Sequence, residues 1–312
     1  MIRLLFVLVV FIIGVMGLQA CHADNSPLTP PQEVTLHFGH QGVRDFYAYT
    51  HGVSEDYPKI LNFSDLTWYP PKLGTVNIRH SNTTVKIPYT FLVVGVRDSR
   101  YLHGIGGMDI SAGLSQTEFT TQEQAYQDYV ALITAFKKAG WQQYFKPFNT
   151  RIAKEDNFKL IMYENPSDTP KDRFVIDSGY SSDSLTLLNF KEWQTMMSRK
   201  FSRGWNGNLY LRDVTVWINI NKTATKPNPI ANQPDLEQYM VDFHFETAKY
   251  EFYGKITDEE TTEQLRQVYE EWRNWEIESR QDKETYAKNA GFRINESYQD
   301  PDMWQYIIEP AY

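Results

Sequence analysis

The 312-residue chain contains only one cysteine, Cys21, so it can form no internal disulfide bond. Its fold must therefore be stabilised by a hydrophobic core, for which a 41% content of hydrophobic residues is ample. Basic residues are also scarce: 31 lysines and arginines stand against 39 aspartates and glutamates, a net charge of −8. An acidic surface repels phosphate groups, so neither nucleic acid nor anionic lipid headgroups are expected as partners.

The signatures of common catalytic sites are missing as well. The G-x-S-x-G motif of serine hydrolases is absent, and the glycine-rich residues 101–115 match neither phosphate-binding pattern, which favours an ordinary loop. The one close histidine pair, His37 and His40, lies on a segment whose alternation predicts a strand. There the i,i+3 spacing points the two side chains to opposite faces. We therefore predict no catalytic residue, no metal site and no cofactor.

The one long apolar run that does occur lies at the start of the chain. Residues 4–15 follow a positive charge and are too few to span a membrane, which is typical of a secretory signal. They lead into Leu18-Gln19-Ala20-Cys21, which resembles the lipobox of bacterial lipoproteins. The resemblance implies a signal peptide over residues 1–20, cleavage after Ala20 and a lipid on Cys21. The alternative is an ordinary signal peptide with a chance cysteine.

The segment behind Cys21 is predicted to be a tether. Residues 21–33 are polar and rich in proline, which favours an extended chain between the lipid and the folded body. Histidine rather than aspartate follows the cysteine, which resembles sorting to the outer membrane in a Gram-negative cell. We therefore expect a lipid-anchored protein of the bacterial envelope that faces the periplasm.

Periodic patterns in the remaining chain predict an α+β fold. Alternation of apolar and polar residues, or a short apolar run, predicts strands at residues 34–38, 76–79, 85–87, 91–96, 214–220, 241–245 and 304–308. Helical spacing predicts long helices at residues 120–138 and 258–288, and a short helix capped by Asn189 and Glu192. The expected architecture is a set of antiparallel sheets, each packed against a long helix.

The two long helices indicate how the chain is divided. Each begins near a Thr-Thr pair and ends at Ala-Gly-aromatic, which favours either two related subdomains or capping chemistry that is merely shared. We predict a first α+β domain at residues 34–150 and a second at residues 170–312, with a single domain as the alternative. The second helix is expected to bury a stripe formed by Leu265, Val268, Tyr269, Trp272 and Trp275. It is also expected to carry the favourable i,i+4 pairs Glu276–Arg280 and Glu284–Lys288.

Two stretches carry a family resemblance. Residues 124–145 (QAYQDYVALITAFKKAGWQQYF) and 175–193 (VIDSGYSSDSLTLLNFKEW) look like parts of bacterial envelope lipoproteins encoded near type VI secretion phospholipase toxins. Such lipoproteins are similar to immunity proteins, and the resemblance covers about the middle half of the chain. It implies a non-enzymatic protein that binds and blocks a secreted lipase toxin in the periplasm. The alternatives are a ligand-binding or envelope-assembly lipoprotein without a toxin partner, and a hydrolase with an unrecognised site.

The contact surface for such a partner is expected on loops, because loops carry much of the function of rigid scaffolds. The leading candidates are residues 101–115 and 221–234. Within them, Tyr101, His103 and Asp109 are the side chains that we predict to contact the partner. The sequence does not fix the oligomeric state.

Overall fold

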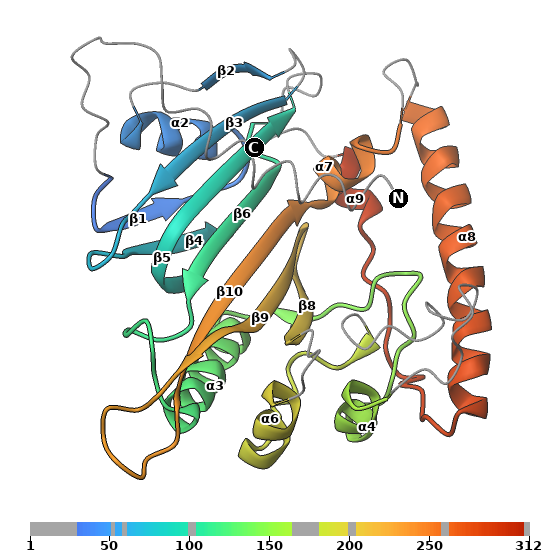
Figure 1. Ribbon diagram of the computed structural model, residues 1–312. Coiled ribbons are helices and arrows are strands. Elements are labelled where there is room, and N and C mark those ends of the chain that lie inside the picture. The colour runs from blue at the N-terminus through green and yellow to red at the C-terminus, as the bar shows by residue number, and fades with distance from the viewer. Residues whose placement is uncertain are drawn as a thin grey trace.

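Ten strands in the described part of the chain form one sheet, with helices packed on it and beside it (Figure 1). The computed structural model describes residues 30–50, 54–57, 61–98, 104–163, 181–198, 204–256 and 262–308. The predicted α+β class is confirmed. The predicted separate sheets are wrong, because β6 (Gly107–Gly113) pairs with β10 (Leu236–Thr247) and so joins strands from the two halves of the chain.

The sheet follows the order β1-β4-β5-β6-β10-β9-β8-β7; in addition, β3 pairs with β5, and β2 pairs with β3. The β1–β4 pair is parallel and every other described pair is antiparallel. The remaining strands are β1 Glu33–Leu36, β2 Ser54–Tyr57, β3 Leu61–Thr67, β4 Gly74–His80, β5 Thr83–Asp98, β7 Gln142–Gln143, β8 Trp205–Leu211 and β9 Val214–Lys226. The helices are α2 Gly39–Tyr49, α3 Gln122–Lys138, a 3-10 turn Lys154–Asp156, α4 Asn157–Ile161, α6 Phe190–Met197, α7 Ala248–Tyr253, α8 Thr262–Asn289 and α9 Trp304–Ile308.

One face of the sheet, called the inner face below, carries the main hydrophobic core. Helices α2, α3 and α6 cover it. Phe136 of α3 stacks on Phe243 and Phe245 of β10 at ring-centroid distances of 6.0 and 6.5 Å. Tyr129 of α3 stacks on Trp193 of α6 at 4.7 Å. Because this core combines residues of both predicted domains, their inward-facing apolar side chains share one interior.

Side chains cap the starts of α3 and α6, and the cap formed by Asn189 and Glu192 is the one that the sequence predicts. The Thr121 hydroxyl accepts a hydrogen bond from the backbone N–H of Gln124 at the start of α3, and Asn189 and Glu192 form a complete capping box on α6. Both long helices end in the same way: Gly140 and Gly291 adopt φ angles of 88° and 82°. The left-handed glycine allows the next N–H to bond back to a carbonyl five residues earlier.

Three predicted elements are wrong. Residues 304–308 form α9 and not a strand, because a short apolar run fits either structure and the Asp302 carboxylate caps the N–H of Trp304. Strand β1 ends at Leu36, so His40 lies in α2 and not on a strand. The expected loop at residues 221–234 begins later, since β9 continues to Lys226.

The glycine-rich residues 101–115 also contain more regular structure than expected, since strand β6 occupies most of their second half. The glycines there permit close packing. A Cβ atom at Gly106 would lie 2.6 Å from the Tyr250 ring. Glycine at this position therefore makes room for an aromatic side chain of α7, which is a packing role.

Candidate functional site

The opposite face of the sheet, the outer face, places polar side chains side by side on neighbouring strands. One row crosses six strands and consists of Asp65, Val94, Asp109, His244, Trp217 and Asn208. Asp109, which the sequence predicts as a partner-binding residue, therefore lies on strand β6 and not on a loop tip. Tyr101, His103, Ala20 and Cys21 lie outside the described residues.

His244 is held between two carboxylates on this face. Its Nδ1 lies 2.5 Å from Asp109 Oδ1, and its Nε2 lies 3.1 Å from Glu246 Oε1. Burial lowers the pKa of His244, but the hydrogen bonds to Asp109 and Glu246 outweigh it and raise the pKa to about 10. The imidazole is thus a cation at neutral pH, and neither ring nitrogen is free to accept a proton. We call His244, Asp109 and Glu246 the His244 cluster.

A second polar pair lies one step along the same strands. The Ser111 hydroxyl donates to Asp242 Oδ1 at 2.8 Å. Burial raises the pKa of Asp242, the Ser111 hydrogen bond opposes that rise, and the nearby charge of Asp109 adds to it. Because the hydroxyl is directed to a carboxylate and the imidazole is protonated, these side chains do not form the nucleophile–base contact of a serine hydrolase. They form a fixed charged surface.

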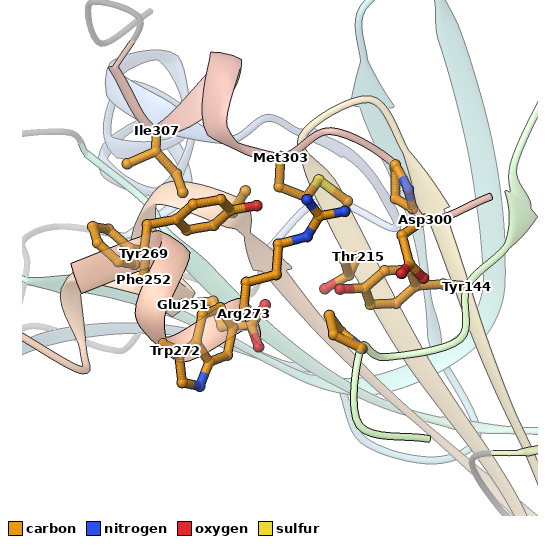
Figure 2. A pocket seen from close by; sticks show the side chains of 13 residues that line it. Tyr144, Thr215, Glu251, Phe252, Tyr269, Trp272, Arg273, Asp300, Met303 and Ile307 are labelled. Atoms are coloured by element: carbon orange, nitrogen blue, oxygen red, sulfur yellow. The ribbon is translucent and has the colours of Figure 1, made fainter. Parts of the chain in front are cut away.

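A small pocket adjoins the outer face where Thr215 contributes to its lining (Figure 2). Helices α7 and α8 line it with aromatic rings, α9 contributes Ile307, and the side chain of Arg273 extends into it from α8. The pocket has a volume of about 30 Å³, which is room for about one water molecule. Of its two carboxylates, Glu251 and Asp300, the second is held by Arg280 through two hydrogen bonds of 2.8 and 2.9 Å.

Helix α8 buries charged side chains on the side that faces the body of the protein. Glu276, Arg280 and Glu284 are 5%, 3% and 7% exposed. Glu284 receives hydrogen bonds of 2.8 and 2.9 Å from Arg151, and Arg280 bonds Asp300. Arg280 and Glu284, which the sequence pairs within α8, thus bond to residues outside the helix, and the charges at 276, 280 and 284 are buried. We call these three residues the α8 seam.

The apolar stripe predicted for α8 is only partly correct. Tyr269 is buried, but Trp275 is 64% exposed. The buried face of α8 runs from Tyr269 through the α8 seam to Ala287. This face is therefore more polar than the predicted stripe of large apolar residues. The spacing of Glu276, Arg280 and Glu284 marks one helix face, but the same spacing is typical of solvent-exposed charges.

Glu276 is the member of the α8 seam with the least complete hydrogen bonding. Its Oε2 is buried and has no hydrogen-bond partner among the described residues. Burial raises the pKa of Glu276 to about 7, with Lys255, Lys146 and Arg280 lowering it and Glu251 raising it. This carboxyl group therefore changes charge near neutral pH.

The two histidines of the close pair, His37 and His40, have different surroundings. His37 Nδ1 lies 2.7 Å from Asp45, whereas His40 is exposed on α2. Within the described ranges, no three His, Cys, Asp or Glu side chains are grouped so that they could hold a metal ion. In the same part of the chain, no helix has both the length and the apolar character needed to cross a bilayer.

One buried polar pair has no signal in the sequence. His80 Nε2 lies 2.8 Å from Asp213 Oδ1, and both side chains are buried although 133 residues separate them. The Phe38 and His80 rings pack at right angles, with their centroids 6.0 Å apart. The pair links the end of β4 to the turn between β8 and β9, so it joins the two halves of the chain.

The geometry thus defines an α+β protein with one largely antiparallel sheet, a helix-covered inner face and a charged outer face. Comparisons of this chain with protein-family models, with curated proteins and with solved structures find no match. The resemblance to immunity lipoproteins therefore stays a prediction.

Proposed function

We propose that this chain is a lipid-anchored envelope protein that binds a secreted lipase toxin and blocks it by direct contact, without catalytic turnover. The observation that carries the proposal is the His244 cluster, in which both ring nitrogens are engaged by carboxylates. The charged groups of this cluster are held in fixed positions, so a partner protein could recognise them. They are poorly suited to moving protons in a reaction.

The outer face supplies the contact surface in this proposal. Asp65 is exposed, and the Asp109 side chain is 54% exposed, so both carboxylates reach solvent. Because paired strands hold them in place, little side-chain or loop ordering is required on binding. Their negative charge favours rapid association with a toxin surface of opposite charge and disfavours acidic competitors.

The lipid anchor predicted on Cys21 completes the proposal. A diacylglyceryl group plus an N-acyl chain is sufficient for stable membrane attachment. The anchor would concentrate the inhibitor at the bilayer that a phospholipase attacks, and it should be dispensable when the protein is in excess. Replacement of Cys21 by alanine should abolish acyl labelling and membrane fractionation. Retention of both in that variant would disprove the lipoprotein assignment.

The central test measures binding and inhibition together. The full chain is titrated against the lipase encoded beside it, and we expect protection that saturates at a fixed stoichiometric ratio. Inhibition at sub-stoichiometric ratios would show turnover and make the chain an enzyme. Absence of binding to any neighbouring toxin would remove the immunity function.

A matched pair of variants tests the role of the outer face. Asp109→Ala should weaken toxin binding about thirtyfold, or about 2 kcal/mol, if Asp109 is a hot spot of the interface. Glu123→Gln removes a similar exposed charge from α3 and should leave affinity unchanged. Equal affinities for the two variants would exclude the outer face as the contact surface.

A further inference from the structure

An exposed turn lies between β3 and β4, at the edge of the sheet. It consists of residues 69–72, Tyr-Pro-Pro-Lys, and all four are exposed. The backbone N–H of Lys72 donates to the carbonyl of Tyr69 at 3.0 Å and closes the turn. Tyr69 is 75% exposed, more than any other large hydrophobic side chain in the described part of the protein. We call residues 69–72 the Tyr69 turn.

Both ends of the Tyr69 turn are fixed to the body of the protein. The backbone N–H of Trp68 donates to the carbonyl of Phe91 at 2.9 Å, and the Trp68 ring is buried. A Cβ atom at Gly74 would lie 2.4 Å from that ring, so glycine allows the chain to pack closely against it. Contact with the turn therefore requires little ordering of the chain.

The first described residues are fastened beside the same turn. Trp68 Nε1 donates to the carbonyl of Pro31 at 3.0 Å, and the N–H of Thr75 donates to the carbonyl of Gln32 at 2.8 Å. These two bonds flank the Tyr69 turn in the sequence. The tether predicted behind Cys21 therefore joins the folded body next to this turn.

We propose that the Tyr69 turn rests in the interface of the phospholipid bilayer that holds the lipid on Cys21. This inference rests on the lipid anchor of the proposed function. Cys21 lies ten residues before Pro31, so an extended tether spans at most about 35 Å and keeps this edge of the body near the bilayer. Tyrosine is enriched at membrane interfaces because its ring is apolar and its hydroxyl is polar.

The charges at the turn favour this contact, although the chain as a whole is acidic. Residues 69–72 contain one basic side chain, that of Lys72, and no acidic side chain. Glu33 at the start of β1 is paired with Lys86 at 3.3 Å and accepts a hydrogen bond from Asn77 at 2.9 Å. The exposed Lys72 is therefore suited to reach the phosphate groups of the bilayer, with its aliphatic stem beside the apolar surface.

This contact orients the outer face relative to the bilayer. Strand β3 leads into the turn, and Asp65 lies four residues before Tyr69, so their Cα atoms are at most about 14 Å apart. The row of outer-face side chains that begins at Asp65 therefore starts close to the bilayer surface. A toxin that acts on phospholipids can reach this row while it stays on the membrane.

Fluorescence quenching tests the contact. The full, lipidated chain is placed in phosphatidylcholine vesicles with a bimane label on Tyr69→Cys or on Trp275→Cys. With Cys21 lipidated, the new cysteine is the only free thiol. Trp275 is the matched control, because it is 64% exposed and lies on α8, across the sheet from β1 and β4 (Figure 1). Brominated acyl chains should quench most of the emission at position 69 and little at position 275, and aqueous iodide should show the reverse order.

A second label and two outcomes complete the test. Lys72→Cys, at the other end of the turn, should be quenched like Tyr69→Cys, and thermal midpoints equal to that of the parent show that the labelled chains fold. Equal quenching by iodide at positions 69 and 275, on chains that float with the vesicles, would exclude the contact and leave the lipid anchor intact. A chain that carries no lipid would remove both the anchor and this inference, whereas toxin titration in solution would still test the immunity function.

Discussion

Helices α3 and α8 begin and end alike in sequence but are held to the protein by different forces. The buried side of α3 consists of Ala125, Tyr129, Ile133 and Phe136, all at most 1% exposed. The buried side of α8 carries the charged residues of the α8 seam, with apolar contacts near both of its ends. Similar caps therefore say little about how a helix packs.

The difference follows from what each helix faces. Helix α3 lies on the apolar inner face of the sheet, where burial of hydrophobic surface is the main favourable term. Helix α8 stands at the side of the sheet (Figure 1), against irregular chain whose carbonyls need donors. Arg280 donates to the carbonyl of Lys146, and Lys283 donates to the carbonyl of Phe148. Long basic side chains of α8 can donate hydrogen bonds to these buried carbonyls, and nearby carboxylates neutralise their charge.

The largest effect is expected in α3. Phe136→Ala removes a fully buried ring and leaves a cavity, so the free energy of unfolding should fall by about 4 kcal/mol. Trp275→Ala on α8 is the matched control: the ring is 64% exposed, and the change should stay within about 0.5 kcal/mol. Urea denaturation of both variants measures the contrast. Similar losses would mean that α8 packs through an apolar stripe after all.

The next effect concerns the α8 seam. Arg280→Met leaves the Asp300 carboxylate without its buried partner and should lower the free energy of unfolding by about 3 kcal/mol. Arg266→Met breaks an exposed i,i+4 pair with Glu270 and should lower it by less than about 0.5 kcal/mol. Adding Asp300→Asn to Arg280→Met should recover part of the loss. No recovery would indicate that Arg280 contributes through packing alone.

The pH dependence of stability should reveal Glu276. Its pKa is raised from 4.5 to about 7 in the folded chain, so the folded state binds the proton more tightly than the unfolded state. The contribution of Glu276 to stability is therefore full below pH 4.5 and is lost progressively as the pH rises to about 7. Glu276→Gln cannot ionise, so it should be more stable than the parent by about 3 kcal/mol above that range.

Thermal unfolding of the parent and of Glu276→Gln across this pH range measures the difference between them. The two curves should converge at acidic pH and separate with rising pH. A constant offset at every pH would show that the carboxyl group does not titrate where expected. Arg266→Met serves as a control whose offset should not vary with pH in this window.

The smallest expected change in the free energy of unfolding is at the start of α3. Thr121→Ala removes the side-chain oxygen that caps the N–H of Gln124, and the free energy of unfolding should fall by about 1 kcal/mol. Thr121→Ser keeps the oxygen and should stay close to the parent. If both variants lose the same amount, the methyl group and not the cap is responsible.

Short-range features of this protein are determined by its sequence. The hairpin of β4 and β5, the β9–β10 pair, the long helices and the capping box of α6 all form where their patterns predict them. These features depend on side-chain alternation, helical spacing and hydrogen bonds between residues a few positions apart. The α+β class follows from them.

Tertiary structure alone decides how those elements are joined and which charges become buried. Nothing local indicates that β6 and β10 connect two halves into one sheet, that His80 meets Asp213, or that His244 meets Asp109. Each contact depends on segments brought together from distant parts of the chain. The charges of α8 show the same limit: their spacing is read from the sequence, but only the neighbours that cover them determine whether they are solvated or buried.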